Sequence, residues 1–241
     1  MMINPEENLL QQELDRFHAE CQKNKFVTNE KKSCVMTFNS SRKYAFPSEF
    51  TLGSSKILQE KSTMKILGVM VQDDLRWGAQ VSHMVRKASK AIWLLRRMRQ
   101  LGVDEATITS YWVSEGRVHL EAGVPVWAGA LTSSQARDLT RVQRRAVAAI
   151  TGRTTRGEEY LATCARLGLE DLATRRTRLA RTFARRTATK SRHTDLFSRL
   201  ENTRPTRAGG KIWREPLCRT RRHQTSAVPY LTRLLNGDNS T

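Results

Sequence analysis

Two rows of basic side chains recur at helical spacing, and their chemistry suits the binding of phosphate groups. The rows are Arg86, Lys90, Trp93 and Arg97 in one segment, and Arg137, Arg141, Arg144 and Arg145 in another. Residues three or four positions apart lie on one face of a helix, so each row would form a ridge. A guanidinium group binds a phosphate through two parallel hydrogen bonds. The eight residues are therefore candidates for binding a polyanion.

Two alternatives stay open for these rows. Charged residues on the outer face of an amphipathic helix commonly do no more than keep that face hydrated. Trp93 would either stack on nucleic-acid bases or be buried against a neighbouring helix. A third row, Arg178, Arg181 and Arg185, has the same pattern. The scarcity of acids on these faces favours binding, because unpaired like charges repel one another.

Adjacent carboxylates at Asp73 and Asp74 indicate a different chemistry. Nucleotidyl-transfer enzymes hold divalent metal ions between aspartates, but no strand predicted before this pair ends in an Asp. Acids in front of a helix also stabilise its dipole. A metal-dependent enzyme using these two residues is the least favoured interpretation. Cys218 and His223 lack a second Cys/His pair, so we expect no bound metal.

The charge balance favours an acidic polymer as partner. The chain has 241 residues and a net charge of +19, with +1 over residues 1–80, +6 over 81–150 and +12 over 151–241. Such an excess favours nucleic acid over a small-molecule substrate. No apolar run is long enough for a membrane span, no secretory signal is recognisable, and the four cysteines lie far apart, as in reducing compartments. We expect an intracellular protein, nuclear or cytoplasmic.

The hydrophobic pattern predicts an α+β, mostly α fold. Residues 4–23 predict an N-terminal helix, and residues 33–38, 49–52 and 65–71 predict the strands of a small antiparallel sheet. Four helices follow, over residues 78–100, 104–121, 132–152 and 170–190, the last burying Leu172, Leu179 and Phe183. Residues after 200 are expected to be a mostly disordered basic tail with at most a short helix at 230–235. The predicted regions are 1–76, 77–199 and 200–241.

Five short motifs follow one another in an order and spacing that resemble a known family. They are Leu67-Gly68-Val69-x-Val71-x-x-x-Leu75-x-Trp77, then Lys87-Ala88-x-Lys90 with Leu95-Arg96-Arg97, then His119-Leu120-Glu121-x-Gly123-x-Pro125-Val126-Trp127, Gln143-Arg144-Arg145-Ala146-x-x-x-Ile150-Thr151-Gly152 and Leu167-Gly168-Leu169-x-x-Leu172-x-x-Arg175-Arg176. Together they resemble the region downstream of the catalytic core in non-LTR (LINE-type) retrotransposon reverse transcriptases.

The resemblance implies a role for each region. Residues 1–76 would be a remnant of the palm with a primer-grip-like hairpin, and 77–199 a thumb-like helical domain. The family's catalytic aromatic-Ala-Asp-Asp hairpin would precede Asn4, so the Mg²⁺ ligands of the family are not expected in this chain, and no catalytic residue is assigned. Gln72 and Gln80 replace the Asp and His usual in the family, which leaves Asp73 and Asp74 at variable positions.

The sequence therefore predicts a truncated reverse transcriptase (RNA-directed DNA polymerase) fragment. It would bind RNA, DNA or a hybrid through its basic helices, without a cofactor and without catalysis. The alternative is a stand-alone Arg-rich helical protein, nucleic-acid-binding or chromatin-associated, with no enzymatic role.

Overall fold

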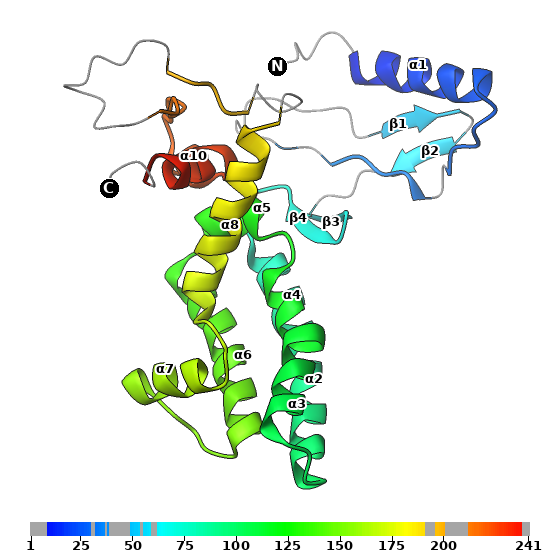
Figure 1. Ribbon diagram of the computed structural model, residues 1–241. Helices are drawn as coiled ribbons and strands as arrows, with labels where there is room; N and C mark the ends of the chain where they lie inside the picture. The colour runs from blue at the N-terminus through cyan, green and yellow to red at the C-terminus, as the bar shows by residue number, and fades with distance from the viewer. Residues whose placement is uncertain are drawn as a thin grey trace. The chain divides into compact units, whose positions relative to one another are not determined.

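The computed structural model divides the chain into two units, residues 1–79 and 80–241 (Figure 1). It describes residues 9–29, 32–36, 38, 49–53, 55–58, 62–190, 196–200 and 212–237. Each unit is treated by itself. The predicted α+β, mostly α class is confirmed, because helices dominate the described residues and the strands belong to the first unit.

The described residues of the first unit form a helix and two β-hairpins that precede the helix beginning at Gly78. Its elements are α1 (Leu9–Lys23), β1 (Glu49–Leu52), β2 (Ser55–Leu58), β3 (Thr63–Ile66) and β4 (Val69–Gln72). Strand β1 pairs antiparallel with β2, and β3 with β4. The small core of this unit is formed by Phe50 and Leu52, against which Leu14 of α1 and Val35 pack. The predicted N-terminal helix is thus present over the residues described.

Two strand predictions need correction. Residues 65–71 form a hairpin, not one strand, because Leu67 (φ 47°) and Gly68 (φ 89°) make the turn between β3 and β4. Positive φ at both central residues is typical of the two-residue turn that matches strand twist. No strand forms over 32–36, where Val35 makes only an isolated bridge; Thr37 lies outside the described residues.

The second unit is helical. Its elements are α2 (Gly78–Gln100, beginning in the first unit), α3 (Glu105–Tyr111), a π-helical turn (Trp112–Arg117), α4 (Val118–Glu121), α5 (Val124–Trp127), a 3₁₀ turn (Ala128–Ala130), α6 (Ser133–Thr151), α7 (Gly157–Arg166), α8 (Leu172–Ala188), α9 (Arg221–Thr225) and α10 (Ala227–Gly237). Helix α6 begins in the predicted capping box of Thr132 and Gln135 and ends at Gly152 in the left-handed conformation. These local signals explain why its bounds could be predicted.

The core of the helical unit joins these elements through large apolar side chains. Its fully buried members include Met84, Leu95, Ile108, Trp112, Leu120, Trp127, Leu139 and Leu172. The predicted helix over 104–121 is continuous but contains the π-helical turn. A Cβ on Gly116 would lie 2.1 Å from the Trp112 ring, so the absent side chain makes room for that indole.

Helix α8 buries a different face from the one predicted. Phe183 is 46% exposed and Leu179 half-buried, whereas Arg176, Ala180 and Ala184 are buried. Small residues let α8 approach α5, α6 and α10, with which it is in contact. The expectation that Phe183 belongs to the core is therefore wrong.

The C-terminal segment is also more ordered than expected. Helices α9 and α10 occupy much of 212–237, and α10 packs against α8 and α5 and buries Leu231 and Leu235. The Asn236 side chain accepts a hydrogen bond from the Trp213 N–H at 3.0 Å and donates one to its carbonyl at 2.9 Å. The prediction of a mostly disordered tail is wrong for this segment; residues 201–211 lie outside the described residues.

Candidate nucleic-acid interface

The row on α2 is exposed to solvent, as predicted. Arg86, Lys90 and Arg97 are exposed, and Trp93 is 70% exposed, so it is not buried against a neighbouring helix. Arg97 donates a weak hydrogen bond to the Gln100 side chain at 3.4 Å. Among the described residues, no carboxylate makes an ion pair with this row. Its charges and its indole are therefore available to a partner.

The row on α6 is exposed too, but it is not free of acids. Arg137, Arg141, Arg144 and Arg145 all face solvent. Asp138 lies 3.1 Å from Arg141 in an exposed ion pair. The guanidinium of Arg144 lies 5.0 Å from the centre of the Tyr160 ring, a cation–π contact.

Three of these α6 arginines line a cavity with arginines from elsewhere in the helical unit. We call the set the arginine cavity; its six arginines are Arg96, Arg99, Arg141, Arg144, Arg145 and Arg156. The cavity has a volume of about 520 Å³, and none of the described residues that line it is an Asp or a Glu. Its walls come from the C-terminal halves of α2 and α6 and from the segment 152–156. Positive charge therefore converges on one concavity.

Local contacts hold several of these side chains in place. The Arg99 guanidinium packs over Gly152, where a Cβ would come within 2.1 Å of it. The Tyr160 ring beneath Arg144 is buried, and its hydroxyl accepts a hydrogen bond from Gln143 at 3.2 Å. Burial raises the pKa of Tyr160, so the phenol stays neutral and adds no negative charge. The walls of the cavity are thus positioned before any ligand binds.

Helix ends offset only a small part of the positive charge. Helices α2 and α6 both end near the cavity, at Gln100 and Thr151. A helix C-terminus carries a partial charge of about −0.5, so the two ends together offset about one of the six guanidinium charges. A concave surface of one sign concentrates counter-ions more strongly than a flat one. The cavity is therefore suited to anions that carry several charges.

The structure brings together only part of the predicted site. Arg141, Arg144 and Arg145 line the cavity, whereas Arg137 and the α2 row do not. Sequence reasoning missed Arg96, Arg99 and Arg156. The spacing of Arg96 and Arg99 signals a shared helix face, but only the position of α6 shows what that face meets.

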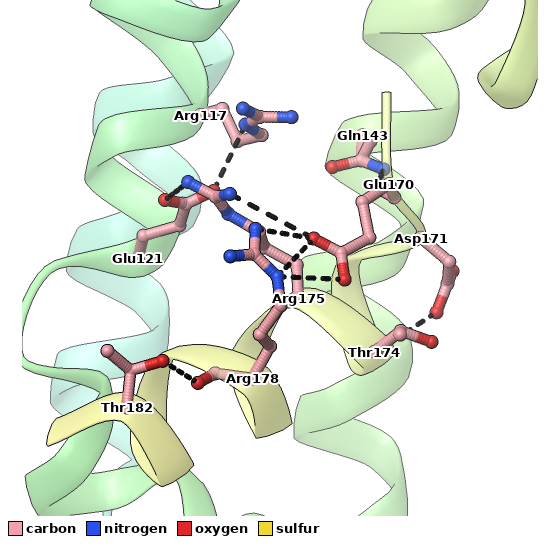
Figure 2. Close-up of polar contacts among 9 residues, drawn as sticks. All are labelled: Arg117, Glu121, Gln143, Glu170, Asp171, Thr174, Arg175, Arg178 and Thr182. Atoms are coloured by element: carbon pink, nitrogen blue, oxygen red, sulfur yellow. Dashed lines mark hydrogen bonds and ion pairs between the residues drawn. The ribbon is translucent and has the colours of Figure 1, made fainter. Parts of the chain in front are cut away.

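Other basic residues belong to an ion-pair network, shown in Figure 2. The Glu121 carboxylate lies 3.0 Å from the Arg117 Nε and accepts two hydrogen bonds from Arg175, at 3.0 and 3.1 Å. Glu170 accepts hydrogen bonds from Arg178, the shortest at 2.9 Å. The charge of Arg178 is therefore compensated by a carboxylate, and the third predicted row is partly neutralised.

The two adjacent aspartates are engaged in a turn after β4. The Asp74 carboxylate accepts a hydrogen bond from the Arg76 backbone at 2.8 Å and lies 3.5 Å from its guanidinium. The Asp73 N–H is 3.4 Å from the Ser62 carbonyl. Within the described part of the chain, no three His, Cys, Asp or Glu side chains gather as metal ligands do.

No protein-family model, curated protein or solved structure matches this chain. The resemblance to reverse transcriptases therefore rests on the sequence motifs alone. Across the residues that the structure describes, no helix combines the length and apolarity needed to cross a bilayer.

Proposed function

We propose that this chain binds nucleic acid through the phosphate backbone, as a thumb-like, non-catalytic part of a protein of the non-LTR reverse transcriptase type. The observation that carries the proposal is the arginine cavity, in which six arginines line about 520 Å³ and no Asp or Glu is among the described lining residues. The exposed row of Arg86, Lys90 and Arg97 is a second surface for phosphates, and Trp93 a platform for a base.

A phosphate presents the same oxygens whatever base it carries, so binding through phosphates is expected to be largely independent of sequence. Each phosphate that an arginine neutralises releases condensed counter-ions, which makes the affinity fall with salt. Trp93 adds stacking that every base can supply. The preference for a single strand or a duplex then depends on how much Trp93 contributes.

The order of the five motifs supports the proposed relation to reverse transcriptases. The engagement of Asp74 in a turn with Arg76 supports a role without catalysis. A second candidate is a stand-alone basic nucleic-acid-binding protein. It is favoured by the buried core of the helical unit, to which Leu231 and Leu235 of α10 contribute.

One experiment tests binding and catalysis together. The purified protein is mixed with a labelled primer–template, Mg²⁺ and the four deoxynucleotides at low salt. We expect a shift in fluorescence anisotropy and no extension of the primer. Lack of binding would contradict the proposal. Extension that is lost in Asp73→Asn and Asp74→Asn would instead revive the metal-dependent enzyme.

A further inference from the structure

We propose that the arginine cavity binds the phosphorylated end of a nucleic-acid strand, with a 5′-triphosphate as its best-matched group. This inference rests on the proposed function and names the part of the nucleic acid that the cavity takes. Three properties of the cavity support it: the concave shape, the number of positive charges, and the contacts that hold some of the arginine side chains in place.

The shape distinguishes the cavity from the α2 row. A row of exposed side chains such as Arg86, Lys90 and Arg97 lies along one helix and can follow an extended strand. The cavity instead has about 520 Å³, within the range of roughly 300–1,000 Å³ typical of small-ligand pockets. A compact group can fill such a concavity, whereas a long strand or a duplex can place only a few of its phosphates in it.

The charge count points to a terminal group. An internal phosphodiester carries one negative charge and exposes two free oxygens. A terminal phosphate carries about −1.5 to −2 and exposes three, so a terminal triphosphate brings about four charges into a space of this size. Six arginines, offset by about one charge from the two helix ends and by the Asp138 carboxylate beside Arg141, leave about four positive charges, which match that number. An internal stretch of a strand would leave several of them without a partner.

Two of the six arginines already have positioning contacts. Arg99 packs over Gly152, and Arg144 lies on the Tyr160 ring. Ordered guanidinium groups lose less conformational entropy when they bind, which favours a small multivalent anion. Thr154 and Thr155 also line the cavity.

The test compares two RNA oligomers of the same sequence, one with a 5′-triphosphate and one with a 5′-hydroxyl, at a fixed salt concentration. The full chain should bind the triphosphate form about tenfold more tightly or better, because the end adds charge-assisted hydrogen bonds. The double variant Arg144→Gln, Arg145→Gln should abolish this preference. The double variant Arg219→Gln, Arg222→Gln removes the same charge at exposed positions outside the cavity and should preserve it. Thermal melting checks that all variants fold.

Inorganic tripolyphosphate separates the end of a nucleic acid from free condensed phosphate. It should compete for the triphosphate-dependent part of the binding and leave a weaker strand-dependent part. If both oligomers bind equally and both depend on Arg144 and Arg145, the inference fails while the proposed function stands. If tripolyphosphate binds but the triphosphate end adds nothing to the oligomer, the inference also fails. If neither oligomer binds, the proposed function fails as well.

Discussion

Replacing Glu121 by Gln should destabilise the helical unit strongly, although the change is one atom. The carboxylate lies between Arg117 and Arg175, with three N–O distances of 3.0 to 3.1 Å. Its side chain is 15% exposed, that of Arg117 9% and that of Arg175 23%. Burial already lowers the pKa of Arg117, and the charge of Glu121 counteracts that shift. Gln keeps the shape and removes the charge that compensates two partly buried cations.

Removing one partner of a buried ion pair costs about 3–5 kcal/mol. The low end applies, about 3 kcal/mol, because Arg175 still has Glu170 at 3.9 Å and some access to water. Urea unfolding followed by the helical circular dichroism signal measures this loss. The matched control is Asp138→Asn, which breaks the exposed pair with Arg141 and should cost less than about 1 kcal/mol. Equal and small losses in both variants would refute the assignment of a buried, charge-dependent network.

Three further predictions concern packing, stacking and pH. Gly116→Ala places a Cβ 2.1 Å from the Trp112 ring and should lower the melting temperature, with a loss of about 1–3 kcal/mol; an unchanged melting temperature would contradict the packing described for the π-helical turn. Trp93→Ala should leave stability nearly unchanged, because Trp93 is 70% exposed, but weaken single-strand binding by about 1–3 kcal/mol; lost stability with unaltered binding would reverse that assignment. A hydrogen bond from Arg166 lowers the pKa of Glu105 below 4.5. The pairing of Glu105 with Arg166 therefore stabilises the folded protein above that pH, and this stabilisation is lost as the pH falls through the lower pKa of the folded state. Acidification from about pH 7 to about pH 3 should therefore lower the melting temperature of the wild type more than that of Glu105→Gln, and identical shifts would refute the linkage.

Local signals in the sequence were enough to predict the main helices. Apolar spacing predicted α2, and the capping box of Thr132 with Gly152 predicted both ends of α6. The hairpin turn at Leu67 was missed because an apolar run continues through it, and the π-helical turn depends on how Trp112 packs over Gly116. The network around Glu121 joins residues 54 positions apart, so no local pattern could reveal it.

The candidate site, too, could be predicted from the sequence only in part. Exposure of the seven predicted basic residues follows from helical periodicity, and the structure agrees for all of them. Periodicity left the burial of Trp93 open, and the structure exposes it. The convergence of Arg96, Arg99 and Arg156 with the α6 arginines depends on tertiary packing, which periodicity does not contain. The sequence therefore supplied the chemistry of the site, while the fold supplied its concave shape.

The salt dependence of binding tests the central claim most directly. Affinity for a single-stranded oligomer is measured over a range of salt for the wild type, for the triple variant Arg96→Gln, Arg144→Gln, Arg145→Gln, and for the control Arg186→Gln, Arg219→Gln, Arg222→Gln. Both variants lose the same net charge, and the control residues are exposed and lie outside the cavity. At about 0.7 per phosphate contact, the cavity variant should flatten the log–log slope by up to about 2, and the control should change it little. Equal slopes for the two variants would contradict the claim that the arginine cavity holds the phosphates.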